Sequence, residues 1–296
     1  MFAPLSLLLA LTLTGVNALN STAQPMHAIM EASPRAPLRE HLILREFGAG
    51  ETAPIRYYDR DMTKYVHLIA VDDRLQTFMH VHPALQRDGR FLLDLTFPHG
   101  GLWHLYADGM PHNFGRQVFR FDLNLPGSTP PRSVRRVTAV SHAGPYTVIL
   151  DRSSLSATRM SMVMVRIEKN GKPATDLQPY LGARAHAVVI GTDLSYIHAH
   201  AMSATLSRTM RMSSGMKMDG MNMPAASKAP APMATDDPCN QDADLGMSMV
   251  ELPASSHVGA TMSVMLTPVR PGPYYLWVQF RGATSVYTAP FVLSVH

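Results

Sequence analysis

Residues 67–82 read HLIAVDDRLQTFMHVH, and residues 186–200 read HAVVIGTDLSYIHAH. The two stretches match position by position except for one residue deleted in the middle of the second. Each has an apolar run, a polar centre and a second short run that ends in His-x-His, a pattern typical of a β-hairpin. Further along the chain, residues 95–105 align without gaps onto residues 266–276. A pattern that occurs twice predicts a duplicated domain.

Short β-type runs continue on both sides of these hairpins, and Gly, Pro and Asp separate them. Since no long segment has the 3.6-residue period of an amphipathic helix, the sequence predicts an all-β protein. Each copy offers about seven strands in roughly 100 residues, which suits a β-sandwich. We therefore expect two tandem immunoglobulin-like or cupredoxin-like β-sandwiches, with a disordered Met-rich insertion in the second.

The N-terminal segment is apolar and ends in Val16-Asn17-Ala18, which has the small-x-small form of a signal-peptidase site. We expect a cleaved signal peptide over residues 1–18, although no Lys or Arg precedes the run. The alternative is an uncleaved membrane anchor, but the run is shorter than the roughly 20 residues that a membrane helix needs. No membrane span is expected in the mature chain. The other predicted segments are a first sandwich over residues 38–126, a Pro- and Arg-rich linker over residues 127–140, and a second sandwich over residues 141–296 with an insertion over residues 202–249.

Composition narrows the class of function. Hydrophobic residues make up 46% of the 296 residues, enough for a core, and the net charge is only +4. The single basic cluster, near Arg135, is too small for a nucleic-acid groove. One cysteine, Cys239, forbids an internal disulfide. The chain has 21 methionines and 14 histidines, which favours metal handling in the periplasm or outside the cell.

The first hairpin predicts a cluster of three histidines. If Asp73-Arg74 is a two-residue turn, His67 lies directly opposite His80, and His82 lies on the same face two residues further on. Directly opposed side chains have Cβ atoms about 5 Å apart and diagonal ones about 7–8 Å, so three imidazoles could meet at one ion.

The second hairpin predicts the same cluster. A three-residue turn absorbs the deletion and sets His186 opposite His198, with His200 alongside. His104 is an additional candidate ligand in the first copy, where Tyr275 is its aligned partner in the second. Neutral imidazole suits Cu(II), Zn(II) and Ni(II), and three of them leave a position open. The alternative is a structural role, in which each ring holds a carbonyl or a loop in place.

Methionines are concentrated in the insertion, with ten of the 21 between Met202 and Met249. Thioether sulfur is a soft ligand that selects Cu(I), and the surrounding polar and small residues leave no apolar face to bury. A low-complexity linker with incidental methionines is the alternative. The candidate ligands of this methionine arm are Met210, Met212, Met216, Met218, Met221 and Met223.

Residues 66–83 resemble the hallmark of exported bacterial proteins with YtkA-like or FixH-like β-sandwich domains, and residues 176–200 resemble the second half of two-domain members. The arm is similar to those of periplasmic copper-resistance proteins. The resemblance implies a role in copper homeostasis or in cytochrome oxidase assembly.

These features together predict an exported, non-enzymatic copper-binding protein, with Cu(I) at the methionine arm and Cu(II) at the histidine triads. Its expected partner is a copper donor or acceptor protein, or a membrane oxidase or transporter. One alternative is an interaction module that binds no metal and assists the assembly of a membrane respiratory complex. The other is a metal-dependent enzyme that uses an open three-histidine site. No nucleophile elbow, phosphate loop or dinucleotide fingerprint is present.

Overall fold

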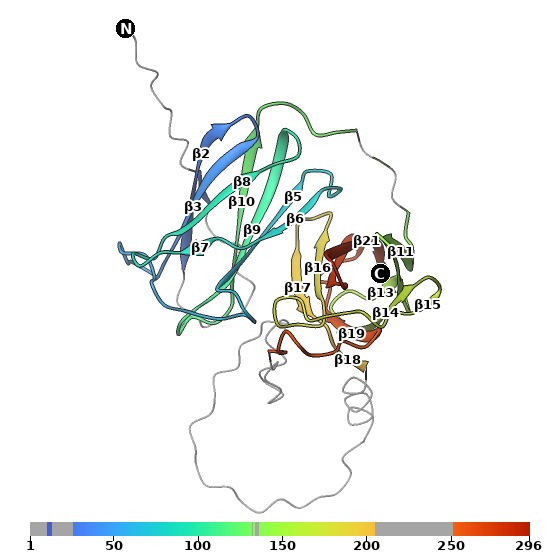
Figure 1. Cartoon of the computed structure of the whole chain (residues 1–296). Helices are drawn as coiled ribbons and strands as arrows, with labels where there is room; N and C mark the ends of the chain where they lie inside the picture. The colour runs from blue at the N-terminus through green and yellow to red at the C-terminus, as the bar shows by residue number, and fades with distance from the viewer. Residues whose placement is uncertain (1–10, 14–25, 132, 134–135, 205–250) are drawn as a thin grey trace, which may run out of the picture. The chain divides into compact units, whose positions relative to one another are not determined.

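The computed structural model describes residues 11–13, 26–131, 133, 136–204 and 251–296. The six candidate methionines lie outside this part of the chain, and so does the predicted signal peptide apart from residues 11–13. Two compact units, Met1–Val134 and Arg135–His296, divide the chain inside the predicted linker. Most strands of both units are labelled in Figure 1, and they confirm the prediction of two tandem all-β domains. Among the described residues, no helix combines the length and apolarity needed to cross a bilayer.

The first unit is a β-sandwich. One sheet has the order β1-β2-β3-β8-β7, the other has the order β10-β9-β5-β6, and β4 pairs with β9. With β1 and β4 set aside, this is the A-B-E-D and G-F-C-C′ order of immunoglobulin-like folds. Its β2 precedes residue 38, where the sequence places the start of the domain. The strands are β1 (Leu11–Leu13), β2 (His27–Ala36), β3 (Arg39–Phe47), β4 (Tyr58–Asp59), β5 (Val66–Asp72), β6 (Phe78–Val81), β7 (Ala84–Leu85), β8 (Phe91–Thr96), β9 (Gly101–Pro111) and β10 (Gln117–Leu125).

The second unit repeats this topology. Its sheets have the orders β11-β12-β14-β19-β18 and β13-β21-β20-β16-β17, and β15 pairs with β14. With β11, β13 and β15 set aside, the remaining strands occur in the same order as β2, β3 and β5–β10. The strands are β11 (Val140–Ala143), β12 (Tyr146–Leu150), β13 (Ser154–Leu155), β14 (Ser161–Lys169), β15 (Lys172–Pro173), β16 (His186–Gly191), β17 (Tyr196–His200), β18 (Met202–Ser203), β19 (Thr261–Leu266), β20 (Gly272–Arg281) and β21 (Val286–Val295).

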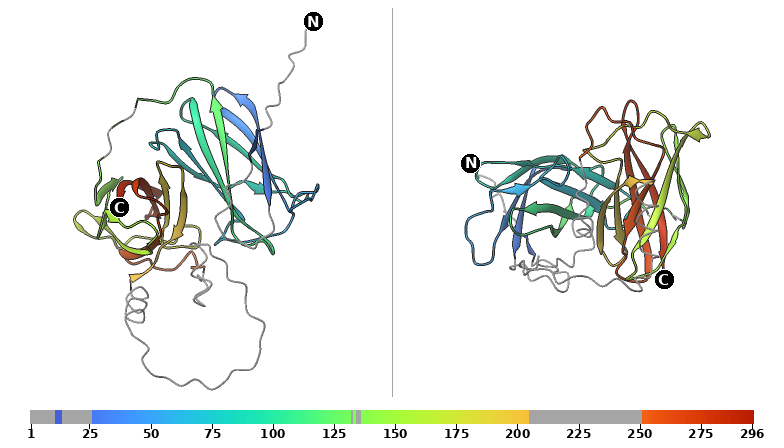
Figure 2. Two further views of the ribbon diagram at one scale, coloured as in Figure 1. Left: turned by 180° about the vertical axis from the view of Figure 1, so that it is seen from behind. Right: turned by 90° about the horizontal axis from the view of Figure 1, so that it is seen from below.

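Equivalent strands in the aligned segments begin and end within one residue of where the internal alignment places them. The glycines Gly101 and Gly272, which the alignment matches, begin β9 and β20. β18 occupies the first two residues of the predicted insertion over residues 202–249, so the additional residues lie between β18 and β19, the equivalents of β7 and β8. Figure 2 shows the strands of each unit from two further sides. The internal repeat predicted from the sequence is therefore a repeat of strand order.

Each histidine hairpin lies at one end of its sheet, where β6 and β17 are edge strands and β5 and β16 are the strands next to them. In β5, Val66, Leu68 and Ala70 pack into the core between the sheets. Since side chains alternate along a strand, His67 and Ile69 lie on the opposite face of the same sheet. The first core also holds large, fully buried side chains, among them Trp103 and Phe91. The fold thus fixes the backbone on which the first histidine sits.

Candidate metal centre

The β5–β6 hairpin brings His67, His80 and His82 together, but in a register that differs from the predicted one. Ile69 is paired with His80, and Leu68 with Val81. One further step along the ladder places His82, not His80, opposite His67. The predicted register was wrong by two residues. Because the side-chain period of a strand is also two, this shift leaves all three rings on one face.

The length of the hairpin loop explains the difference. The Asp72 N–H donates to the Thr77 carbonyl at 3.4 Å, so residues 73–76 form a four-residue loop instead of a two-residue turn. Leu75 adopts a positive φ of 55°, and its N–H donates to the Asp72 carbonyl at 2.9 Å. The Asp72 carboxylate accepts two further backbone N–H bonds, from Gln76 at 2.7 Å and Thr77 at 3.1 Å. The dipeptide Asp73-Arg74, from which a two-residue turn was predicted, therefore does not indicate the hydrogen bonds that close this loop.

The second hairpin has the same shift. Here His186 is paired with His200, and Val188 with His198. The Gly191 N–H donates to the Ser195 carbonyl at 2.9 Å and closes a three-residue loop over residues 192–194. One residue fewer in this loop absorbs the deletion, as predicted. The two hairpins therefore keep an equivalent histidine register.

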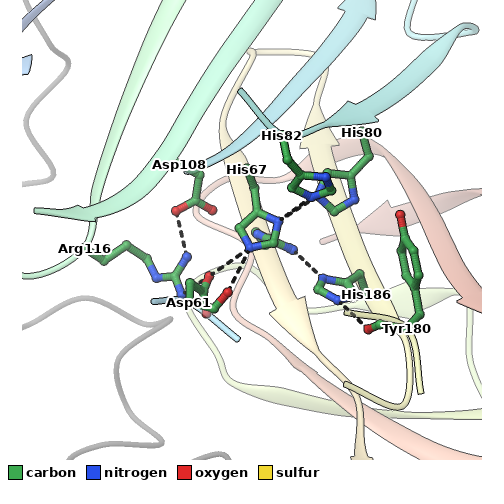
Figure 3. Close-up of polar contacts among 9 residues, drawn as sticks. Asp61, His67, His80, His82, Asp108, Arg116, Tyr180 and His186 are labelled. Atoms are coloured by element: carbon green, nitrogen blue, oxygen red, sulfur yellow. Dashed lines mark hydrogen bonds and ion pairs between the residues drawn. The ribbon is translucent and has the colours of Figure 1, made fainter. Parts of the chain in front are cut away.

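Three ring nitrogens converge in the first triad (Figure 3). His67 Nδ1 lies 2.8 Å from His80 Nε2 and 3.2 Å from His82 Nε2. The ring centroids of the three residues are 4.8–5.1 Å apart. Two imidazoles bound to one ion at about 2.0–2.1 Å, with bond angles from square to tetrahedral, have nitrogens roughly 2.9–3.4 Å apart. The spacing of the triad therefore fits a shared metal ion.

A backbone carbonyl fixes the tautomer of His67. Its Nε2 lies 3.2 Å from the Asp61 carbonyl oxygen, which can only accept, so the proton belongs on Nε2. The Nδ1 lone pair then faces both His80 and His82. Because one in-plane lone pair accepts one good hydrogen bond, the second neighbour gains little, whereas a cation accepts lone pairs from all three rings. A ligating histidine typically donates its other N–H in this way.

A tight turn presents that carbonyl. Asp61 and Lys64 exchange backbone hydrogen bonds of 2.8 and 3.2 Å, and Met62 between them has a φ of 53°. Tyr180 and Ala183 make the equivalent pair in the second unit, at 2.8 and 3.1 Å. Non-glycine residues seldom adopt positive φ, yet Met62 and Leu181 (51°) both do so, five residues before the first histidine of each triad. The turn of the second unit has a further positive φ of 83° at Gly182, so the two turns are similar but not identical.

The second triad repeats the contact between the first two histidines and the contact to the carbonyl. His186 Nδ1 lies 3.1 Å from His198 Nε2, and His186 Nε2 lies 3.0 Å from the Tyr180 carbonyl oxygen. The His200 ring centroid is 4.7 Å from that of His186 and 4.9 Å from that of His198. Figure 3 labels His186 and Tyr180. Both units thus contain three clustered imidazoles and one tautomer-fixing carbonyl.

Buried charges surround the first triad. Asp108 on β9 is the register partner of His67. The Arg116 guanidinium donates at 2.7 Å to Asp108 and at 2.7 Å to Asp61, whose Oδ2 lies 3.8 Å from His67 Nε2 (Figure 3). All three charged side chains are at most 8% exposed. In the second unit the position opposite His186 holds Gln279.

Sequence reasoning missed Asp61, Asp108 and Arg116. A usable signal was present at Asp108, an acidic residue inside an otherwise apolar strand, because such a residue is rarely buried without a partner. Nothing in the sequence indicated the role of the Asp61 carbonyl, because every residue has a backbone carbonyl whatever its side chain.

His104, the other candidate ligand in the first unit, lies apart from the triad. It sits on β9 opposite Val71 of β5, four residues and therefore about 13 Å along the strand from His67. Its Nδ1 lies 2.7 Å from Asp122 Oδ1 on β10. The structure thus joins His104 to a carboxylate and does not bring it to the other three rings.

An unusual carboxyl lies inside the first core. Glu46 on β3 is fully buried, and burial raises its pKa to about 8. The Tyr58 hydroxyl partly opposes this effect, whereas the charge of Asp108 adds to it. Burial, together with the neighbouring Glu46, also raises the pKa of Tyr58. Glu46 is therefore mostly protonated at neutral pH.

Comparisons with known proteins identify a family without an assigned activity. No curated protein matches the chain. Among solved structures, the Escherichia coli adhesin FdeC is 9% identical over 93% of this chain and 65% of its own, with a TM-score of 0.26. A glycosyl hydrolase family 2 member from Bacteroides cellulosilyticus is 10% identical over 92% of this chain and 29% of its own, with a TM-score of 0.22. The chain thus spans less than two thirds of either protein. Residues 41–125 and 139–223 both match one family, and the chain belongs to that family, described as Domain of unknown function (DUF8832).

Proposed function

We propose that the chain is an exported, non-enzymatic copper-binding protein in which His67, His80 and His82 hold Cu(II). The observation that supports this most is the approach of His80 Nε2 and His82 Nε2 to His67 Nδ1, at 2.8 and 3.2 Å, with the remaining His67 nitrogen bonded to a carbonyl. The second triad is proposed as an equivalent site. The likeness of residues 66–83 to YtkA-like and FixH-like domains also favours copper.

The donor set favours copper among the divalent ions. Three neutral imidazoles are ligands of intermediate softness, and Cu(II) binds such sites more tightly than Ni(II) or Zn(II). Three ligands leave a coordination position open for water or for a group of another protein. Such a position permits transfer of the ion to a partner, which suits a copper donor or acceptor as the interacting protein.

The methionine arm is proposed to hold Cu(I). Neutral thioethers select soft monovalent ions and keep their function where a thiol would be oxidised to a disulfide. Together the arm and the triads would allow one chain to hold copper in either oxidation state.

Titration of the full chain with Cu(II) against a competing chelator tests the first triad. Loss of outer-shell partners alone lowers metal affinity by about 10–100-fold, so loss of two ligands in His80→Ala/His82→Ala should lower it by more than about 100-fold at that site. The matched control is His41→Ala/His112→Ala. Its rings bond to Asp94 and Asp59 in the same unit, at 2.7 and 3.0 Å.

Three measurements distinguish ligation from a structural role. In a His198→Ala/His200→Ala background, which removes the second proposed site, ligation predicts nitrogen hyperfine coupling in the Cu(II) electron paramagnetic resonance (EPR) spectrum that is lost in the triad variant and kept in the control. It also predicts an unchanged fold of the metal-free variant by circular dichroism. Collapse of the thermal transition with no change in Cu(II) affinity would refute the proposal in favour of hydrogen-bonded core histidines.

The arm and the export signal have separate tests. Replacing the six arm methionines by leucine should weaken Cu(I) binding and leave Cu(II) binding at the triads unchanged. N-terminal sequencing of the protein from its native host should begin at Leu19 if the signal peptide is cleaved after Ala18. An intact N-terminus would contradict cleavage.

A further inference from the structure

Methionine side chains gather on the outer face of one sheet of the second unit. In β14, Val163 and Val165 point into the core. Since side chains alternate along a strand, Met162 and Met164 lie on the opposite face, away from that core. Met160 continues this row one residue before β14 begins, and it is 56% exposed. Three thioethers therefore follow one another along the outer face of this part of the chain.

The neighbouring strands add two more thioethers to the same face. Met265 of β19 is the register partner of Met162, and Val264 beside it points into the core. On the other side of β19, Met202 of β18 is paired with Ser263, which lies two residues from Met265 and so on the same face. The methionine face is defined here as Met160, Met162, Met164, Met202 and Met265.

The strand register places the central sulfur atoms within reach of one ion. Directly opposed residues have Cβ atoms about 5 Å apart, and residues two positions apart on one strand are separated by about 7 Å. Methionine has three rotatable bonds, so its sulfur can move toward a shared point between neighbours. Met162 and Met265 can therefore bind one ion together, with Met160 or Met164 as a third ligand. Met162, Met164 and Met265 are partly exposed, so an ion can reach them from solvent.

The first unit shows that the sandwich does not require methionine on this face. One position before the aligned segments, Met265 corresponds to Asp94, and the register then matches Met162 with His41. In the first unit, His41 Nδ1 lies 2.7 Å from Asp94 Oδ1, and the Arg39 guanidinium lies 3.4 Å from the same carboxylate. The duplicated face is thus polar in one unit, as is usual for the outer face of an antiparallel sheet, and carries thioethers in the other.

The ligand class follows from the chemistry of the thioether. Neutral sulfur ligands select soft ions such as Cu(I) over Zn(II) and Mg(II). We infer that the methionine face is a binding site for a soft monovalent cation, Cu(I), with Met162 and Met265 as its central ligands. This site goes beyond the proposed function, because it needs neither a histidine triad nor the methionine arm.

Titration of the full chain with Cu(I) against a competing chelator tests the site. The background removes the other proposed sites by replacing every methionine of residues 205–250 with leucine, Cys239 with serine, and His80, His82, His198 and His200 with alanine. This chain should still bind one equivalent of Cu(I). Met162→Leu/Met265→Leu should lower the affinity by more than about 100-fold, since two ligands are lost. Leucine keeps the size and apolarity of methionine, so this variant tests the sulfur and not the packing.

Methyl NMR spectroscopy shows where the ion binds. Cu(I) has a filled d shell and is diamagnetic, so carbon-13-labelled methionine methyl signals remain visible when sulfur binds it. The Met162 and Met265 signals, assigned with the leucine variants, should shift on addition of Cu(I). Met262 provides the matched control, because it lies on β19 as Met265 does but points into the core and is 0% exposed. Its signal should not shift, and Met262→Leu should keep the Cu(I) affinity of the background.

Exchange of residues between the units tests whether these residue types are sufficient. Met162→His/Met265→Asp gives the second unit the pair that the first unit has, and it should lower the Cu(I) affinity. Arg39→Met/His41→Met/Asp94→Met makes the reverse change and should add a Cu(I) site to the first unit. Circular dichroism of each metal-free variant checks folding, and the reverse exchange keeps the inference testable if a variant of the second unit does not fold.

The outcomes separate this inference from the proposed function. An absence of Cu(I) binding in the background, or binding that Met162→Leu/Met265→Leu leaves unchanged, would overturn the inference. Either result would leave Cu(II) binding at the triads intact, because that is measured with the histidines in place. Loss of Cu(I) affinity in Met162→Leu/Met265→Leu but not in Met262→Leu would support the inference whatever the triads bind.

Discussion

Replacing Glu46 with glutamine should make the first unit more stable at alkaline pH. Glu46 points with Leu42 and Leu44 into the space between the sheets, where its residue is 0% exposed. Neither of its carboxylate oxygens makes a hydrogen bond of good geometry to another described residue. A buried carboxylate without such partners is costly, and the folded protein avoids the cost by keeping the proton, with a pKa of about 8.

The sign and size of the effect follow from the two pKa values. In the unfolded chain Glu46 titrates near 4.5, so between pH 4.5 and 8 the folded state binds one proton more than the unfolded state. The free energy of unfolding therefore falls as pH rises through this interval, by up to about 1.4 kcal/mol per pH unit. The total loss approaches about 5 kcal/mol at pH 8 and stays constant above it. Glutamine cannot ionise, so the variant lacks this loss.

Urea unfolding at pH 5, 6, 7 and 8 measures the difference. Trp103 lies in the first core and Trp277 in the second unit, so a Trp277→Phe background lets tryptophan fluorescence report the first unit alone. For each protein the free energy of unfolding is plotted against pH. Subtracting the Glu46→Gln plot from the parent plot separates the contribution of Glu46 from that of the histidines, which titrate in the same range. Glu31→Gln, which removes a partly exposed partner of Arg45 on the neighbouring strand, is the control and should keep the pH dependence of the parent. Equal pH dependence in the parent and in Glu46→Gln would refute the reasoning.

Two further predictions concern single hydrogen-bonded groups, one in each unit. Asp72→Ala should lower the stability of the first unit by about 2 kcal/mol in urea unfolding, because two backbone N–H groups of the hairpin loop lose their acceptor. Asp72→Asn keeps an acceptor oxygen and should lose less; an equal loss would contradict the role of that oxygen. Tyr146→Phe should lower the stability of the second unit by about 1.5 kcal/mol, because the hydroxyl donates to the Asp176 carboxylate at 2.9 Å. A change of the same size in Tyr287→Phe, whose hydroxyl lies 3.4 Å from that of Thr284, would argue against this assignment.

The histidine hairpins show which part of a β-structure a sequence can predict. Apolar and polar alternation fixes the face of each residue, so the clustering of the three rings was predictable. The register depends on the loop, and here Leu75 and Leu194 adopt positive φ values of 55° and 65°. Leucine has no preference for that region, unlike Gly, Asn or Asp, so no residue type marked the longer loops. An error of one residue would have separated the rings, whereas the actual error of two did not.

The sequence did not predict groups that act through their backbone atoms, or groups that pair with residues far away along the chain. The carbonyls of Asp61 and Tyr180 have the same role in spite of unrelated side chains, because the turn that presents them requires only a positive φ at the next residue. The Arg116 partners are 8 and 55 positions away along the chain, so only the fold reveals the cluster. Duplication identified the ligand candidates, whereas the charges around them required coordinates.

The internal duplication also bears on why the rings are retained. The two copies differ at positions around the triad, with Asp61 replaced by Tyr180 and Asp108 by Gln279, yet all three imidazoles occur in both. If these side chains only had to form hydrogen bonds with one another, residues in which each donor faces one acceptor would be sufficient. In the first triad two rings instead approach one lone pair at 2.8 and 3.2 Å, so without an ion at least one contact is poorly satisfied, and such contacts cost stability. An arrangement in the first triad that is unfavourable without a cation, and the recurrence of the three imidazoles in the second unit, favour selection for binding over selection for stability, and this supports the copper proposal.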